Sequence, residues 1–402
     1  LASSEGGPPS PSSTLTPKIL RTPPRRITPI VTEQTLMIEE NWHIPRHEYE
    51  INADDVIGQG NFGCVYRGMW YDIPIAIKVL HTCDVEEEDR ELFLKEIEIM
   101  QQLHHPCITQ FLGFSKRTEF AGAALLMEFL ENGSLDDYLY GYPRTSQDVR
   151  IRWCKQMASA LAYLHNRKPN FLIHRDVKPS NFLLTAALNC KLADFGVSRL
   201  FDSNVHPLQP QTPSTATSMF KVGTRLSRGP KSPITGWRLR REISVSVEQT
   251  GNVGTVRYMA PEVRKLTLGP SQGAVGSNVR ASYGVKADVF SVGMVMYFVF
   301  ENAPPSLDGV QTPDEHFESL EKGMRPAYCR TRKALRRVID LCLRQNIESR
   351  PSSLELLTLL TGLSSQRKWP CCSRPDPKHE EAFEAAEKIL VRFKTPTGPH
   401  QP

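Results

Sequence analysis

The sequence predicts a protein of the α+β class, in which a small β-rich lobe with one main helix precedes a larger, mostly helical lobe. Short runs rich in β-branched and aromatic residues, separated by Gly, Asp and Pro, fill residues 50–129. Helical patterns prevail after Glu131. One stretch, residues 201–250, is rich in Ser, Thr, Pro and Gln and follows neither pattern, so it interrupts the second lobe.

A length of 402 residues has room for two or three domains, or for one large domain with tails, and a hydrophobic content of 40% is enough for a core. The net charge of +5 permits contact with phosphates but does not by itself indicate nucleic-acid binding. Seven prolines between Pro8 and Pro29, among many Ser and Thr, predict that residues 1–41 form a disordered tail. Because the chain begins with Leu1 rather than Met, we expect a fragment or a processed form.

The elements of the first lobe follow from the spacing of its apolar residues. Between the strands, residues 91–103 repeat apolar side chains at helical spacing and predict one amphipathic helix. The runs that predict β-strands are 51–57, 64–68, 74–80, 107–114 and 123–129.

The second lobe is predicted to be mainly helical, with helices at 134–140, 149–165 and 289–300. Short β runs stand at 171–173, 181–184 and 190–193. The apolar run 289–300 has twelve residues, which is too short to cross a bilayer, so we expect a buried core helix and no transmembrane segment. In the tail 364–402, one further helix is predicted at 377–393, with Asp376 as N-cap and Pro377 in its first position.

The nine cysteines form no CxxC pair and are scattered through apolar segments. That distribution predicts reduced thiols rather than a disulfide framework, and with it a cytoplasmic location.

The first stretch that carries chemistry is GQGNFGCV, Gly58–Val65. A GxGxxG pattern alone is weak, because dinucleotide folds use it between a strand and a helix. The residues that follow here, CVYRG, are β-branched and aromatic, so strand–turn–strand is favoured. Its glycines would let a hairpin lie close over phosphates.

Lys78 ends the alternating run IAIK and could be a simple surface charge at a strand end. Glu96, however, lies within the apolar stripe of the predicted helix 91–103. A carboxylate on a buried face is costly unless a cation meets it. We therefore expect Lys78 to pair with Glu96, which would hold the lysine toward the phosphates of a nucleotide.

A second group of polar residues lies in IHRDVKPSN, residues 173–181. Asp176 can accept the proton of an attacking hydroxyl, Lys178 can neutralise charge on a moving phosphoryl group, and Asn181 can bind a metal. Asp194, in ADFG, adds a second oxygen ligand for magnesium. Each alone could be an ordinary loop residue, but their combination and order favour phosphoryl transfer.

These pieces together resemble the eukaryotic protein kinase family. Further matches are GTVRYMAPE (254–262), KADVFSVG with Asp288, and Arg350, which matches the position that pairs with Glu262. The resemblance covers about residues 50–362. It implies a bilobal protein kinase fold over residues 50–363, with ATP and Mg²⁺ bound in the cleft.

The resemblance also implies the walls of the nucleotide site. Met127 matches the gatekeeper position, and the backbone of the hinge Glu128–Leu130 would meet the adenine. Val65, Ala76 and Leu183 match the positions that sandwich the adenine ring. The remaining nucleotide-binding positions implied by the family are Ile57, Gly58, Gly60 and Gly63.

Lys178, two residues after Asp176, and Thr255 match serine/threonine-specific kinases. The wider sequence is similar to the tyrosine-kinase-like group, whose members are mostly serine/threonine enzymes. A dual-specificity kinase and a nucleotide-binding pseudokinase or scaffold remain alternatives, although every catalytic position holds the expected residue type. The expected partners are a protein substrate and an upstream activating kinase, and not a nucleic acid.

The resemblance assigns residues 197–259 to an expanded activation segment, longer than the family usually has. Within it, GPKSPITGWRLRR (229–241) carries four positive charges and no negative one. This insert would bias the enzyme toward acidic substrates, hold the segment away until modification, or be a tolerated surface insertion. Arg175 matches the arginine that grips a phosphate on the segment, for which Thr250 is the first candidate, followed by Ser246 and Ser244.

Overall fold

The computed structural model describes residues 42–60, 63–80, 87–116, 122–202, 256–263, 284–365 and 377–393. The predicted N-terminal tail 1–41, most of the insert and the candidate phosphorylation sites at 244, 246 and 250 lie outside these ranges.

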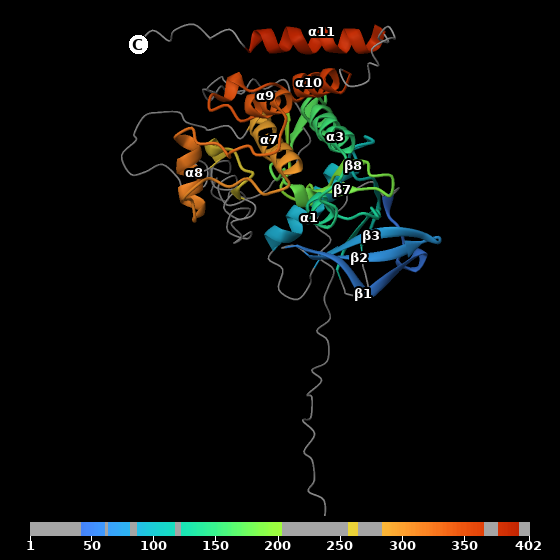
Figure 1. Ribbon diagram of the computed structural model, residues 1–402. Helices are drawn as coiled ribbons and strands as arrows, with labels where there is room; N and C mark the ends of the chain where they lie inside the picture. The colour runs from blue at the N-terminus through green and yellow to red at the C-terminus, as the bar shows by residue number, and fades with distance from the viewer. Residues whose placement is uncertain are drawn as a thin grey trace, which may run out of the picture. The chain divides into compact units, whose positions relative to one another are not determined.

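The first lobe contains a five-stranded antiparallel sheet in the order β1-β2-β3-β5-β4. Tyr71 and Asp72 have positive φ angles of 45° and 63°, which fit the tight two-residue turn between β2 and β3. Figure 1 shows β1, β2 and β3 side by side. The strands are β1 (Tyr49–Gly60), β2 (Gly63–Trp70), β3 (Ile73–Leu80), β4 (Phe111–Ser115) and β5 (Ala124–Glu128).

One face of this sheet is closed by the chain that precedes β1. Ile44 packs in the same apolar core as Ile75 and Leu126, and its backbone N–H donates to the carbonyl of Phe114 at 2.9 Å. At Gly113 a Cβ atom would lie 2.6 Å from Ile44 Cδ1, so a side chain there would displace this segment.

Strand β4 begins at Phe111, four residues later than the sequence predicts. The preceding residues bond to a strand of the second lobe instead. Thr109 N–H donates to the carbonyl of Leu192 at 2.9 Å, and Leu192 N–H donates to the carbonyl of Cys107 at 2.9 Å. Alternation alone could not reveal this partner.

Helix α1 (Glu87–Met100) carries Glu96 and ends three residues before its predicted end. The N–H of Leu103 bonds to the carbonyl of Met100 at 3.1 Å, which is a tight turn rather than a further α-helical turn. Phe93, Ile97 and Met100 are buried, as the apolar stripe predicts.

The second lobe is built on α7, the run predicted as a core helix, whose residues from Ala287 to Glu301 are all buried. Serine side chains cap the first turns of α2 and α3, and Thr312 forms a capping box at α8. Helix α10 packs against α3 and α11, as can be followed in Figure 1. The helices are α2 (Leu135–Gly141), α3 (Gln147–His165), α7 (Val285–Glu301), α8 (Pro313–Glu321), α9 (Lys333–Cys342), α10 (Ser353–Ser365) and α11 (Pro377–Arg392).

Four short strands of the second lobe flank the loops that contain Asp176 and Asp194. β7 (Phe182–Leu184) pairs with β8 (Cys190–Leu192), and β6 (Asn170–Ile173) pairs with β9 (Arg199–Asp202). Sequence analysis did not predict β9, because four residues without a clear alternation give no strand signal.

Helix α11 is attached to the second lobe by both charge and apolar contact. Ala386 is buried, Arg392 forms an ion pair with Glu355 of α10, and the guanidinium of Arg344 stacks 5.2 Å from the ring centre of Phe393. Among the described residues, no helix is both long and apolar enough to cross a membrane.

Candidate active site

Lys78 lies on β3 opposite Val65 of β2, and its ammonium group reaches two carboxylates. Its Nζ atom lies 2.8 and 2.7 Å from the two carboxylate oxygens of Glu96, and 3.1 Å from Oδ1 of Asp194. The exposed fractions of Lys78 and Glu96 are only 9% and 2%. The structure therefore brings together the pair that the sequence predicts, with Asp194 as an additional partner.

The neighbouring carboxylates keep Lys78 positively charged. Burial alone would lower the pKa of Lys78, but the carboxylates of Asp194 and Glu96 outweigh burial and raise it. Conversely, the positive charge of Lys78 lowers the pKa of Asp194 to about 2 despite desolvation. With this low pKa, Asp194 is ionised near pH 7. Its side chain is 47% exposed, so its carboxylate oxygens still have surface available for a ligand.

The loop after β6 gathers the three other predicted catalytic side chains. Lys178 Nζ lies 2.8 Å from Oδ2 of Asp176. The amide nitrogen of Asn181 donates to Oδ2 of Asp176 at 2.9 Å and to its backbone carbonyl at 2.8 Å. Because that nitrogen is engaged with Asp176, the amide oxygen of Asn181 is the atom left for a cation.

This loop is held by Asp288, a fully buried residue of α7. Its carboxylate accepts hydrogen bonds from the backbone N–H groups of His174 at 2.8 Å and Arg175 at 2.9 Å. Its Oδ2 atom also lies 3.0 Å from Nε2 of His165. Burial would raise the pKa of Asp288, but these hydrogen bonds outweigh it and lower the pKa.

The bond to the Arg175 N–H supports an unusual backbone conformation, because Arg175 has a φ of 73°. Asp194, which does not bond to Asp288, has a φ of 59°, and both angles are in the left-handed region that non-glycine residues rarely adopt. Such conformations cost roughly 1–3 kcal/mol each and persist where surrounding contacts impose them. Sequence analysis matched Asp288 through the resemblance but missed His165, because a histidine at a helix C-terminus is common for its dipole interaction alone.

The glycine-rich stretch forms a hairpin between β1 and β2, with residues 61–62 outside the described ranges. A strand therefore follows it, as the sequence predicts, and not the helix of a dinucleotide fold. At Gly63 a Cβ atom would lie 1.9 Å from the carbonyl oxygen of Val79, so only glycine fits this approach to β3.

The predicted adenine-contact positions lie on neighbouring strands. Ala76 pairs with Met127 across β3 and β5, and Gly58 pairs with Val65 across β1 and β2. Leu183 lies on β7 and forms a bridge to Ser134, four residues after Leu130 in the chain. The other predicted nucleotide-binding residues on this sheet are Ile57, Gly60 and Glu128.

The residues present fit a magnesium–nucleotide complex. Magnesium prefers hard oxygen ligands and usually takes only one or two protein groups together with phosphates and water. Asp194 offers an ionised carboxylate and Asn181 an amide oxygen, while Lys78 adds a fixed positive charge.

One charged pair at the hinge has no counterpart in the sequence prediction. Lys191 of β8 lies with its Nζ 2.7 and 2.8 Å from the carboxylate oxygens of Glu128. The same carboxylate accepts the backbone N–H of Gln110 at 2.6 Å, and Glu128 N–H donates to the carbonyl of Gln110 at 3.1 Å. In the sequence, Lys191 is only a charged residue between the apolar residues of a short strand, which does not predict a partner.

Glu262, three residues after the predicted activation segment 197–259, is held by Arg350, which is fully buried. Its guanidinium binds Glu262 with both nitrogens, at 2.6 and 3.0 Å, and lies 4.9 Å above the ring centre of Phe290. The pairing implied by the resemblance is therefore formed.

Comparisons with known proteins agree with this geometry. A model described as "Protein kinase domain" matches residues 51–231, and one described as "Protein tyrosine and serine/threonine kinase" matches residues 233–360. The serine/threonine-protein kinase VIK of Arabidopsis thaliana is 29% identical over 80% of this chain and 61% of its own length. Mitogen-activated protein kinase kinase kinase 7 of Homo sapiens is 27% identical over 81% of this chain and 43% of its own.

The U-box domain-containing protein 70 of Oryza sativa is 37% identical over 45% of this chain and 22% of its own length. The chain thus spans between about a fifth and three fifths of the length of these relatives. The predicted family and α+β fold are confirmed, since the two family models together match residues 51–360 and the matched region has a β-sheet followed by helices. The chain belongs to the protein kinase family.

Proposed function

We propose that this chain is an active serine/threonine protein kinase, which transfers the γ-phosphoryl group of ATP to hydroxyl groups of protein substrates. The observation that carries the proposal is the three-way contact of Lys78 with Glu96 and Asp194. This contact supports the proposal because it would align a lysine that binds the phosphates, from the first lobe, with a carboxylate that binds the metal, from the second.

Each residue of the second lobe has one task in the proposed reaction. Asp176 accepts the proton of the substrate hydroxyl. The hydroxyl oxygen attacks the γ-phosphorus of ATP, and the bond between that phosphorus and the β-phosphate oxygen breaks, so that ADP leaves. Lys178 lies 2.8 Å from Asp176 and neutralises charge on the moving group. Burial would lower the pKa of Lys178, but the Asp176 carboxylate outweighs it and raises the pKa, so the lysine is charged.

Asn181 and Asp194 would hold the magnesium. ATP supplies the phosphoryl group, and Mg²⁺ neutralises its charge when bound. The hinge backbone at Glu128–Leu130 would bind the adenine, with Met127 beside it. The apolar walls that we propose for the adenine are Ile57, Val65, Ala76, Leu130 and Leu183.

The test is transfer of radiolabelled phosphate from ATP to a generic protein substrate. Asp176→Asn should lower kcat by about 10²–10⁴-fold, the usual contribution of a general base, while nucleotide binding is retained. Equal transfer by both proteins would refute the proposal. Nucleotide binding without transfer by the unmodified chain would favour the pseudokinase, and label on tyrosine would favour dual specificity.

We also propose an upstream activating kinase as a partner, acting on the activation segment at Thr250 and, after it, Ser246 or Ser244. A phosphate on the segment would be bound by Arg175, the residue before the catalytic aspartate. If Thr250→Ala kept full activity, Thr250 would not be the site.

A further inference from the structure

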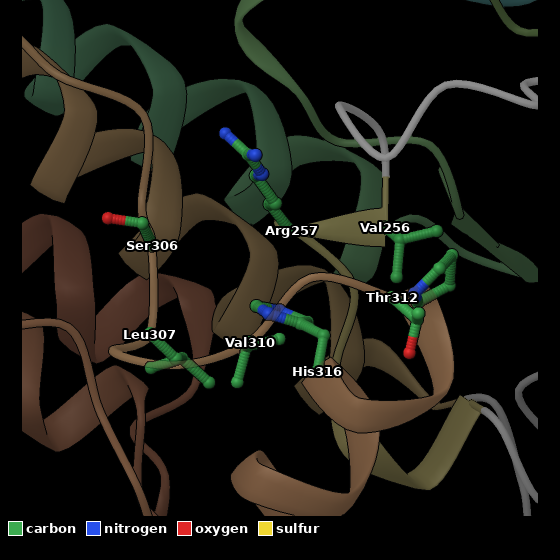
Figure 2. A pocket seen from close by; sticks show the side chains of 8 residues that line it. Val256, Arg257, Ser306, Leu307, Val310, Thr312 and His316 are labelled. Atoms are coloured by element: carbon green, nitrogen blue, oxygen red, sulfur yellow. The ribbon is translucent and has the colours of Figure 1, made fainter.

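Residues 256–263 include the end of the predicted activation segment and are packed in the second lobe. Val256 is buried, and Figure 2 shows it beside Thr312 at the start of α8, where the two residues line one small cavity. Glu262, in the same stretch, is bound by Arg350. How far this stretch can move therefore depends on how firmly Arg350 is itself held.

One connection to Arg350 runs through Arg344, which lies just beyond the end of α9. The Nη2 atom of Arg344 donates to the carbonyl of Phe393, the residue after the last residue of α11, at 2.9 Å. Its Nη1 atom donates to the carbonyl of Ser349 at 3.3 Å, and its own carbonyl accepts from Nε of Arg350 at 2.8 Å. Carbonyl groups at a helix C-terminus lack partners inside the helix and carry the negative end of its dipole, so a guanidinium suits them. The Arg344 side chain thus joins the end of α11 to the residue before Arg350.

A second connection reaches the other side of Arg350 through Glu355, in the first turn of α10. One carboxylate oxygen of Glu355 forms an ion pair with Arg392 of α11, and the other accepts the backbone N–H of Ser352 at 2.7 Å. Burial would raise the pKa of Glu355, but the Ser352 N–H and Arg392 outweigh burial and lower it, so the carboxylate is charged near pH 7. The turn that carries Arg350 is therefore bonded on both sides to side chains that α11 holds.

The attachment of α11 itself involves little buried surface. Among the residues of α11 whose exposure is described, only Ala386 is buried. Between α9 and α11 the structure leaves a cavity of about 210 Å³, whose apolar lining residues are Leu341, Leu390 and Phe393. An element with few buried apolar contacts opens at a lower free energy than the whole protein unfolds. Helix α11 can therefore detach while the rest of the second lobe stays folded.

We propose that the C-terminal end of α11 is a positioning element for the proposed reaction and acts on Glu262 through Arg344 and Glu355. When α11 is docked, it fixes the two side chains that flank Arg350, so Arg350 holds Glu262 and residues 256–263 in place. When α11 detaches, Arg344 loses a carbonyl partner, and the turn that carries Arg350 loosens. The inference rests on the proposed function, because it names a means of regulating that reaction.

The first experiment measures hydrogen exchange of residues 256–263 in the full chain, which requires no phosphoryl transfer. Arg344→Gln removes the charge that binds the Phe393 carbonyl and should accelerate this exchange by about tenfold, the usual size of one charged hydrogen bond, with β3 unchanged. Arg344→Lys keeps the charge and should restore part of the protection. Arg337→Gln, an equal charge change at an exposed position of α9, should alter nothing.

The second experiment detaches α11 directly. Ala386→Asp places a carboxylate at the buried contact, so residues 256–263 should again exchange about tenfold faster, whereas Glu387→Asp at the exposed neighbouring position should alter nothing. In the background Arg344→Gln/Arg392→Gln, where both connections are absent, Ala386→Asp should add little, because changes along one path are not additive. Unchanged exchange in Ala386→Asp, or effects that simply add, overturns the inference, even if Arg344→Gln fails to fold.

A third measurement separates the inference from the proposed function. If the chain transfers phosphate, Ala386→Asp should raise KM for the protein substrate several-fold and leave KM for ATP constant, because the contacts of Lys78 remain. A chain that transfers no phosphate refutes the proposed function, while the exchange experiments still decide whether α11 holds residues 256–263. Faster exchange in β3 together with a rise in both KM values would mean that α11 only stabilises the whole chain, and would overturn the inference.

Discussion

At the scale of single residues, Lys78 connects the two lobes through charge. Its ammonium group is shared between a carboxylate of α1 and one that follows β8. The sequence could predict the pair with Glu96, because a carboxylate inside an apolar helical stripe requires a nearby cation. It could not predict the Lys191–Glu128 pair, because both residues are only partly buried and neither position demands a partner.

Removing the cation alone should be costly. Lys78→Met leaves Glu96 buried without its partner and should lower the free energy of unfolding by about 3–5 kcal/mol. The double variant Lys78→Met/Glu96→Leu should recover most of that loss and yet remain inactive in transfer. Urea unfolding measures the stability, and a double variant as unstable as the single one would show that the buried charge is not the cause.

Asp194 should remain ionised throughout the physiological range. Its pKa of about 2 lies below the usual value near 3.9. A depressed pKa contributes stability above the usual value, which is lost as pH falls toward 2. The difference in unfolding free energy between the unmodified chain and Asp194→Asn should be constant from pH 8 to 5.

The control for this pH series is Lys78→Met, in which the main cause of the low pKa is absent. In that background the difference should begin to shrink at a higher pH. If the difference already varies between pH 8 and 5 when Lys78 is present, the carboxylate is not held by Lys78.

At the scale of elements, β8 joins the predicted hinge at Glu128 to the loop that carries Asp194, the proposed metal ligand. Its Lys191 binds Glu128, its Leu192 bonds to residues 107 and 109, and Asp194 follows two residues later. The strands of the first lobe were predictable from their β-branched and aromatic runs, and the helices at 149–165 and 289–300 from their apolar residues. The late start of β4, the early end of α1 and the existence of β9 were not, since each depends on a backbone partner far away in the chain.

Removing the Lys191–Glu128 ion pair should weaken ATP binding more than it slows phosphoryl transfer. Lys191→Met removes the cation that fixes the Glu128 carboxylate, so the hinge backbone should shift and KM for ATP should rise by up to about tenfold. The value of kcat should change less, and Lys191→Arg should restore most of the affinity. Steady-state kinetics over a range of ATP concentrations decides, and a fall in kcat at constant KM would contradict this role.

At the scale of the whole molecule, the second lobe is centred on α7. This helix provides Asp288 for the catalytic loop and Phe290 beneath Arg350. Sequence motifs matched Asp288 and Arg350 to positions of the family, but only the fold shows that one helix contacts both the loop that carries Asp176 and the residue that binds Glu262.

Arg350→Lys should weaken this organisation without unfolding the first lobe. A lysine cannot bind Glu262 with two nitrogens or keep the bond to the carbonyl of Arg344, so we expect a loss on the order of 3 kcal/mol. Hydrogen exchange should become faster in residues 256–263, with β3 unchanged as the internal control. Uniform acceleration in both regions would mean that Arg350 stabilises the chain only globally.

The two attachments of the activation segment have an evolutionary consequence. On one side β9 is paired with β6, and on the other Glu262 is bound by Arg350. Because both ends are fixed independently of what lies between them, the intervening sequence can change in length and charge at little cost to the catalytic groups. Substitutions and insertions confined to that stretch could therefore change which proteins the proposed kinase acts on, while the contacts of Lys78 and Asp176 stay as they are.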